Sequence, residues 1–200
     1  MNQILIENIG FLRLSPQQIN ESIQKNNGLL IVPNVLLSTA DEENGNGRTY
    51  PMQVLKEAMD RYEQKVQFGN AYGACDHEDE PEVKLQTASH RIIAIKWNGN
   101  KVYGDIEILD SPEFACGRII GGLLRRNMPV GISSRSVGSV RTEGDKTIVE
   151  SLEISCYDFV SNPSNHNSFA NLSESLGIKL PQSNKKYDNI NRIIQDILSI

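Results

Sequence analysis

The stretch PVGISSRSVGSV, residues 129–140, carries branched apolar side chains typical of a β-strand but interrupts them with serine, arginine and glycine. Side chains alternate between the two faces of a strand. Ile132 and Ser134 therefore share one face, and Ser133 and Arg135 share the other. If the apolar face covers a core, Ser133 points toward a cleft or solvent and Ser134 is the more buried hydroxyl.

The segments around this stretch complete a sheet. Further strands are predicted over residues 28–37, 83–97, 102–109 and 147–160. The turn sequences Asn98-Gly99-Asn100 and Glu143-Gly144-Asp145 join consecutive strands into hairpins. Because proline cannot donate a ladder hydrogen bond, Pro33 makes the first of these segments an edge strand or two short strands.

Two principal helices are predicted. The first begins at Pro51, after which apolar residues recur at three- and four-residue steps: Met52, Leu55, Met59, Tyr62 and Val66. The second has Ser111 as N-cap, Pro112 at the first helical position and Glu113 in the first turn, and it ends at Arg125 or Arg126. Together with the hairpins, these helices predict an α+β fold with a mainly antiparallel sheet.

The composition indicates a globular chain with a net charge of -5 and a pI near 5.3. No basic face is evident that would neutralise phosphates, so we expect no direct nucleic-acid partner. No run approaches the roughly 20 apolar residues that span a bilayer, and the N-terminus lacks the features of a secretory signal. We therefore expect no membrane contact and a cytoplasmic protein. The three cysteines are odd in number and widely spaced, so we expect them to be reduced.

The chain divides into three parts by composition. We expect an N-terminal segment over residues 1–27, a folded domain over 28–168, and a polar linker followed by an amphipathic helix over 169–200. The last part carries an apolar stripe that must pack on this domain or on another copy of the chain: Ile190, Ile193, Ile194, Ile197 and Leu198.

Three residues have the side chains of a nucleophile, a base and an orienting acid: Ser133, His77 and Asp158. A serine hydroxyl is a poor nucleophile until a base accepts its proton, and the base works best when a third polar group orients it. Each residue also has an ordinary interpretation. His77 would be unremarkable in a solvated acidic loop, Ser133 in a bulge, and Asp158 as the cap of a turn.

A divalent metal site is an alternative for the acidic loop. Its oxygen and imidazole ligands would be Asp76, His77, Glu78, Asp79 and His90. Consecutive loop residues seldom converge on one ion, and the loop lacks the helical His-x-x-x-His spacing of zinc sites. Metal binding is therefore the minor alternative.

Five stretches together resemble one family, the prohead core proteases of tailed bacteriophages, which are serine peptidases that mature the capsid. In chain order they are NGNGRTYPMQVLKEAMDRYEQ (45–64), GACDHEDEPEVKL (73–85), ASHRIIAIKWNGNKVYGDIEIL (88–109), MPVGISSRSVGSV (128–140) and DFVSNPSN (158–165). The family is similar in fold to the herpesvirus assembly proteases. The resemblance therefore implies an α+β, herpesvirus-protease-like fold with a mainly antiparallel, barrel-like core and flanking helices.

The resemblance also implies roles for individual residues. The family's histidine corresponds to His77, its nucleophile to Ser133, and the third member to Asp158 on the following strand. The family often has proline directly after the histidine, whereas Glu78-Asp79-Glu80 stand there in this chain. Three neighbours are secondary candidates: Ser134, Arg135 as a solvated strand residue or a donor near the oxyanion, and His90 as a packed histidine or a second imidazole.

The implied function is a serine endopeptidase of the phage prohead that needs no cofactor. Its expected substrates are scaffold and core proteins, the major capsid protein and its own tails. We expect it to be a homo-oligomer inside the prohead, in the host cytoplasm. Two alternatives remain at this point. One is an inactive structural virion protein, in which His77 and Ser133 would lie too far apart to bond, and the other is a metal-dependent hydrolase that uses the acidic loop.

Overall fold

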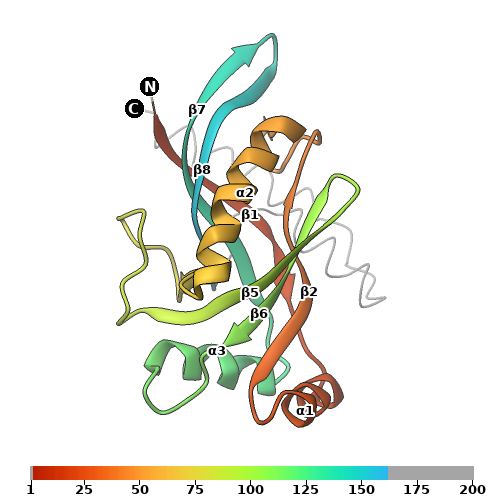
Figure 1. The fold of residues 1–200 in the computed structure, drawn as a ribbon, viewed down its shortest axis with the longest axis vertical. Coiled ribbons are helices and arrows are strands. Elements are labelled where there is room, and N and C mark those ends of the chain that lie inside the picture. The colour runs from red at the N-terminus through yellow and green to blue at the C-terminus, as the bar shows by residue number, and fades with distance from the viewer. Residues whose placement is uncertain (1, 162–200) are drawn as a thin grey trace, which may run out of the picture.

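The computed structural model describes residues 2–161. In chain order its elements are β1 (Gln3–Leu12), α1 (Pro16–Lys25), β2 (Leu30–Thr39), β3 (Arg48–Thr49), α2 (Met52–Phe68), β4 (Tyr72–Ala74), β5 (Ala88–Asn98), β6 (Lys101–Ile108), α3 (Ala115–Arg125), β7 (Val130–Glu143) and β8 (Lys146–Val160). Figure 1 shows the long β7–β8 hairpin at one end of the molecule and α1 at the other.

The strands form two four-stranded sheets, in the orders β1-β7-β8-β3 and β2-β6-β5-β4. Every pair is antiparallel except the short parallel contact of β3 with β8. The α+β class and the mainly antiparallel pairing are therefore confirmed. The barrel-like core is corrected: within residues 2–161 the two sheets do not close into a barrel. The outer strands β3 and β4 have only two and three residues, and such short edges offer few backbone groups for closing pairs.

Both predicted hairpins are present. β5 and β6 are joined through Gly99 and Asn100, and β7 and β8 through Gly144 and Asp145. Gly99 has a φ of 60° and Gly144 a φ of 61°, a left-handed conformation that glycine adopts without steric cost. The strand containing Pro33 is β2, which lies at the edge of its sheet as predicted, and its ladder is irregular around that proline.

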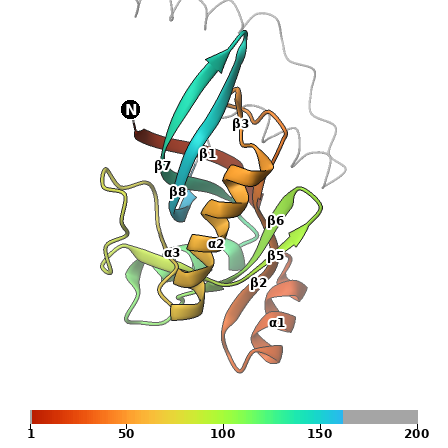
Figure 2. The ribbon, with the colours of Figure 1, turned by 45° about the horizontal axis from the view of Figure 1, so that its top comes forward.

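Helix α2 follows the predicted apolar spacing and connects the two sheets. It begins directly after Pro51 and ends at Phe68, and the following Gly69 has a φ of 79° that lets the chain leave the helix. Its buried side chains are Leu55, Ala58, Met59 and Tyr62. The helix packs on β8 of one sheet and β5 of the other, as the tilted view in Figure 2 shows. This packing holds β8, which carries Asp158, against the rest of the domain.

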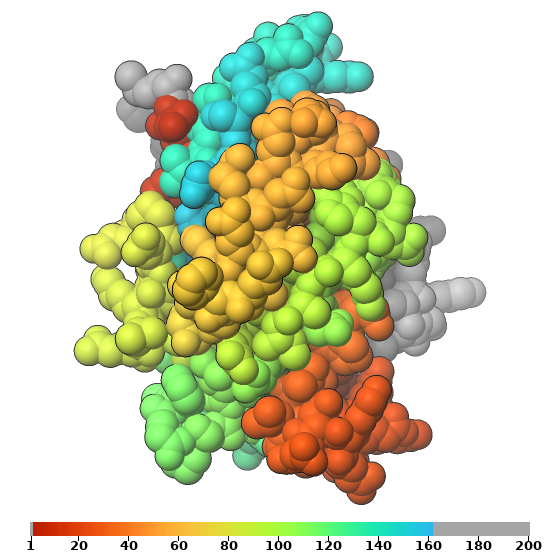
Figure 3. Space-filling model, viewed as in Figure 1, coloured from red at the N-terminus to blue at the C-terminus, as the bar shows by residue number. Residues whose placement is uncertain are grey.

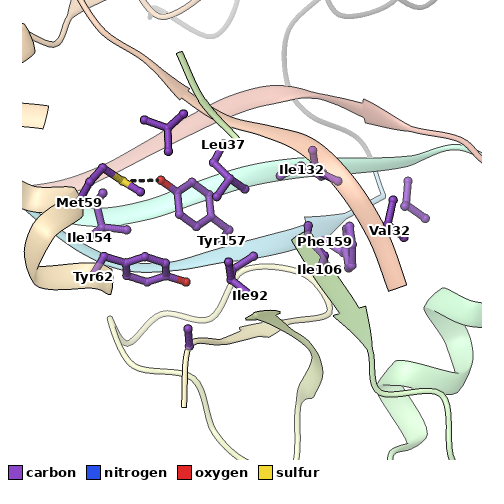
Figure 4. Packing of buried hydrophobic residues seen from close by; sticks show 14 of the residues in the cluster. Val32, Leu37, Met59, Tyr62, Ile92, Ile106, Ile132, Ile154, Tyr157 and Phe159 are labelled. Atoms are coloured by element: carbon purple, nitrogen blue, oxygen red, sulfur yellow. Dashed lines mark hydrogen bonds between the residues drawn. The ribbon is translucent and has the colours of Figure 1, made fainter. Parts of the chain in front are cut away.

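The core under α2 is centred on two tyrosines (Figure 4). The rings of Tyr62 and Tyr157 meet edge to face, with their centroids 5.5 Å apart. The Tyr157 hydroxyl lies 2.9 Å from the Ser38 hydroxyl on β2, so a hydrogen bond joins the two sheets through the core. Tyr62 Oη is buried and has no hydrogen-bond partner among the described residues.

Two elements near the N-terminus were not predicted. β1 pairs with β7 along most of its length and buries Leu5 completely. α1 begins with a capping box in which the Ser15 hydroxyl accepts from the Gln18 amide and the Gln18 side chain accepts from the Ser15 amide. Ser15, Pro16 and Gln18 have the spacing of a helix start and were the signal available in the sequence.

Two predicted boundaries are wrong. α3 begins at Ala115 rather than after Ser111, because the Ser111 hydroxyl bonds the Glu113 carboxylate at 2.5 Å instead of capping an amide. Residues 83–84 have no regular structure and residues 85–87 form a turn, so the strand begins only at Ala88. The Thr87 amide bonds the Lys84 carbonyl at 3.0 Å, which curls the chain there.

No helix within residues 2–161 is long and apolar enough to cross a membrane. The amphipathic helix predicted over residues 189–200 and the polar linker before it lie outside the described residues.

Candidate active site

The β7–β8 ladder places Ser133 directly opposite Asp158. Directly opposed residues of an antiparallel pair project from the same face of the sheet, so the hydroxyl and the carboxylate lie side by side. Both residues are completely buried. The pairing of two strands therefore brings a serine and an aspartate together from positions 25 residues apart in the chain.

His77 is brought to the same place by the loop after β4. Asp76 has a φ of 65°, its amide donates to the Phe159 carbonyl at 2.7 Å, and its carboxylate accepts from the Ser161 amide at 3.2 Å. A short polar side chain that bonds nearby backbone tolerates this left-handed conformation. The loop stands out from the surface beside β8 and α2, in yellow at the left of Figure 3. The turn at Asp76 thus directs His77 toward the end of β8.

His77 bridges the other two residues. Its Nδ1 lies 2.8 Å from Asp158 Oδ2, and its Nε2 lies 3.0 Å from Ser133 Oγ. Since an ionised carboxylate only accepts hydrogen bonds, Nδ1–H donates to Asp158, and the lone pair of Nε2 faces the hydroxyl. About a quarter of the His77 side chain is exposed. The three residues have the order and distances of a serine–histidine–aspartate triad.

Asp158 is held as a carboxylate by several donors. Burial alone would raise its pKa, but the hydrogen bonds from His77 and the Ala74 amide and the charge of Arg135 together lower the pKa below its ordinary value. Cys156 adds a thiol hydrogen bond of 3.3 Å to Oδ1. Burial, followed by the charge of Asp158, raises the pKa of that thiol, which keeps it a neutral donor.

The predicted burial of the two serines is wrong. Ser133 is completely buried, whereas Ser134 retains 8% exposure. The alternation itself holds, because Ser134 lines a cavity on the opposite face with Leu37 and Tyr157. Ser133 is nevertheless covered, since β1 pairs alongside it and the His77 loop packs over its face. The face that Ser134 shares lies away from Asp158.

The Ser133 hydroxyl has a second acceptor, the Glu7 carbonyl oxygen of β1 at 3.0 Å. The Glu7 side chain extends to the other side of β1. There its carboxylate accepts from Tyr50 and Arg48, each at 2.5 Å, and from Asn46 at 2.6 Å. This contact was not predicted from the sequence. The available signal was the run of isoleucines and other apolar residues over 3–12, which favours a strand. Leu5 and Glu7 are the buried residues of that strand and share one of its faces.

Arg135 is not a solvated strand residue. It is 1% exposed, and its Nε lies 3.1 Å from Asp158 Oδ2.

His90, in contrast, directs its hydrogen bonds to groups other than Ser133, His77 and Asp158. Its Nε2–H donates to the Tyr157 carbonyl at 2.9 Å, its Nδ1 lies 2.9 Å from the Ser89 hydroxyl, and its ring packs on Phe159. Burial lowers the pKa of His90 to about 4, although the nearby Asp158 opposes the change.

The acidic loop does not assemble the predicted metal ligands. Glu78 instead closes the loop, accepting from the Thr87 hydroxyl at 2.5 Å and the Lys84 amide at 3.2 Å. Within residues 2–161, no group of three or more histidine, cysteine, aspartate or glutamate side chains is placed to hold a metal ion.

Comparisons with known proteins agree with this architecture. The chain is 28% identical to the prohead core protein protease of Enterobacteria phage T4 over 118 residues, which are 58% of this chain and 55% of that protein. The aligned part therefore spans about half the length of that relative. Among solved structures, the capsid assembly protease gp21 of bacteriophage T4 has a TM-score of 0.66 at 22% identity. That match covers 81% of this chain and 99% of the other, and at this identity it shows a shared fold.

A family model described as prohead core protein serine protease matches residues 12–175, most of the chain. This span includes β7, β8 and the loop that carries His77. The chain belongs to the prohead core protein serine protease family.

Proposed function

We propose that this protein is a serine endopeptidase that acts in phage capsid maturation. The observation that carries the proposal is the chain of hydrogen bonds from Asp158 through His77 to Ser133, at 2.8 and 3.0 Å. Membership of the prohead protease family supports the peptidase activity and the place of action.

The proposed mechanism assigns one role to each residue. Ser133 Oγ attacks the carbonyl carbon of the scissile peptide bond while His77 Nε2 accepts its proton. Asp158 holds the Nδ1–H tautomer and stabilises the imidazolium that forms. The imidazolium then returns the proton to the leaving amine, and a water molecule activated by His77 hydrolyses the acyl-enzyme. Because Ser133 is buried, a substrate must displace part of its cover before attack.

The expected substrates are scaffold and core proteins, the major capsid protein and the protease's own tails. A homo-oligomeric state, a location inside the prohead in the host cytoplasm, and kinship in fold with herpesvirus assembly proteases belong to the same proposal. So does the division of the chain into segments 1–27, 28–168 and 169–200, of which the last contains the expected self-cleavage sites.

The two alternatives have less support. An inactive structural protein would place His77 and Ser133 too far apart to bond, but the separation is 3.0 Å. A metal-dependent hydrolase would gather the acidic loop around His77, but Glu78 bonds Thr87 and His90 bonds Tyr157 instead.

The test compares two serine variants that differ only in the face of β7 they occupy. Ser133→Ala is expected to remain at full length and to leave the capsid and scaffold proteins uncut, whereas Ser134→Ala keeps the parent's activity because it lies on the opposite face. Intact mass over time measures self-cleavage, and gel analysis of added scaffold protein measures cleavage in trans. Equal processing by Ser133→Ala and the parent would refute the assignment.

A further inference from the structure

Arg135 is a charged side chain buried in the sheet two residues after Ser133. It is 1% exposed, although arginine is almost never fully buried unless it is paired. Burial of an unpaired charge is very costly, so its partners indicate why it is there. The guanidinium contacts two structures: the carboxylate of Asp158 and the backbone of the loop that carries His77.

On one side Arg135 forms a fork with Asp158. Its Nε donates to Oδ2 at 3.1 Å and its Nη2 to Oδ1 at 3.3 Å. Such paired contacts between guanidinium and carboxylate fix orientation as well as charge. Asp158 Oδ2 is also the atom that accepts from His77 Nδ1. The arginine therefore fixes the oxygen that orients the imidazole.

On the other side Arg135 fastens the loop. Its Nη1 donates to the Glu78 carbonyl at 3.2 Å and also to the Glu80 carbonyl, and its Nη2 lies 3.6 Å from the Glu78 carboxylate. Glu78 directly follows His77. One guanidinium thus ties the backbone beside His77 to the carboxylate that His77 must meet.

We infer that Arg135 is a positioning residue of the proposed active site, which holds Asp158 ionised and oriented and keeps the His77 loop in register with it. The inference rests on the proposed function. The hydrogen bonds of the guanidinium are directed to Asp158 and to loop carbonyls, so Arg135 acts through other residues rather than on the substrate.

The charge of Arg135 has a consequence for the pH dependence of catalysis. Asp158 and Arg135 together are neutral, so His77 faces a compensated carboxylate. Without the guanidinium the pKa of Asp158 rises, and a protonated Asp158 cannot hold the Nδ1–H tautomer of His77, so the acid limb of kcat/KM moves to higher pH. The other ionisable groups facing Asp158 or Arg135 are Glu78 on the loop, Cys156 on β8, His90 on β5 and Tyr62 on α2.

The experiment compares Arg135→Met, Arg135→Lys and Arg141→Met by the pH profile of peptide hydrolysis. Arg141 is the matched control, an exposed arginine of the same strand that pairs with Glu143 and Glu150. In Arg135→Met we expect the acid limb to move upward by about one pH unit and kcat to fall about 100-fold. Arg135→Lys restores the charge but not the fork, so its acid limb returns to the parent's position while kcat stays low. Arg141→Met keeps the parent's profile.

Circular dichroism establishes that each variant is folded. If Arg135→Met does not fold, Arg135→Lys carries the test through a fall in kcat at unchanged KM. A folded Arg135→Met with the parent's profile, or an Arg135→Lys with the parent's kcat, overturns the inference. Failure of the proposed function is distinguishable, because it would appear as full activity in Ser133→Ala.

Discussion

Ser133 and Glu7 are joined by a hydrogen bond of 3.0 Å from the serine Oγ to the backbone carbonyl oxygen of β1. A hydroxyl has one proton, so this carbonyl competes with His77 Nε2, which lies at the same distance. β1 is an edge strand, and the polar contacts of the Glu7 side chain with Tyr50 and Arg48 hold it in place. Access to Ser133 and the position of its proton therefore both depend on how firmly β1 is held.

Weakening these contacts should expose the nucleophile. In Arg48→Met the nearly buried Glu7 carboxylate loses its cationic partner, which makes local opening of β1 easier. We expect a fluorophosphonate to label Ser133 about tenfold faster, which corresponds to about 1.4 kcal/mol in the opening equilibrium. Mass spectrometry measures the rate. Arg118→Met on the exposed side of α3 is the control, and equal rates in the parent and Arg48→Met would contradict the prediction.

Asp158→Asn separates catalysis from stability. An amide favours the wrong imidazole tautomer, so kcat should fall by about 10⁴. The same change removes the nearer anionic partner of the buried Arg135 and leaves only the Glu78 carboxylate at 3.6 Å, which should cost about 3 kcal/mol in unfolding free energy. Adding Arg135→Met should recover part of that stability but none of the activity. Urea unfolding and peptide hydrolysis measure the two effects, and a double variant no more stable than Asp158→Asn would rule out this coupling.

His90 should make the domain sensitive to mild acid. Burial lowers its pKa from 6.5 to about 4, so between these values the unfolded chain binds a proton that the folded protein does not. The free energy of unfolding is therefore not reduced by His90 above about pH 6.5, and it falls as the pH is lowered from there to about 4. The loss corresponds to about 3 kcal/mol. Urea unfolding at pH 7 and pH 4 measures it. His90→Gln should lack this component, and an equal pH dependence in parent and variant would contradict the assignment.

The two core tyrosines should respond oppositely to loss of the hydroxyl. Tyr157→Phe breaks the link to Ser38 between the sheets and should lower the free energy of unfolding by about 1 kcal/mol. Tyr62→Phe removes a buried hydroxyl that has no partner among residues 2–161, and it should leave stability unchanged or raise it by about 1 kcal/mol. Thermal and urea unfolding measure both. Destabilisation of Tyr62→Phe as large as that of Tyr157→Phe would disprove the distinction.

Local sequence patterns predicted the parts of the fold that depend on local chemistry. The apolar spacing after Pro51 predicted α2, and the glycine turns predicted both hairpins. Alternation along β7 correctly separated the faces of Ser133 and Ser134. Each of these features is determined by neighbours within a few residues.

The remaining features depend on contacts between distant segments. Ser133 is buried because β1, some 125 residues earlier, pairs beside it and supplies the Glu7 carbonyl. Alternation shows which way a side chain points but not what lies there. Likewise, the environment of Arg135 depends on a loop that arrives after β4, so its sequence neighbours gave no sign of burial.

The β7–β8 ladder determines where the chain can change in length. Its two bulges each add one residue to β8, at Glu150 and Ser155. Deletion of Ser155 would close a bulge and leave Asp158 opposite Ser133. Deletion of Tyr157, in the regular part of the ladder, would instead bring Phe159 opposite the serine. Insertions and deletions are therefore compatible with the site at the bulges and at the hairpin tip. They are incompatible with it in the paired segments Ser133–Arg135 of β7 and Cys156–Asp158 of β8.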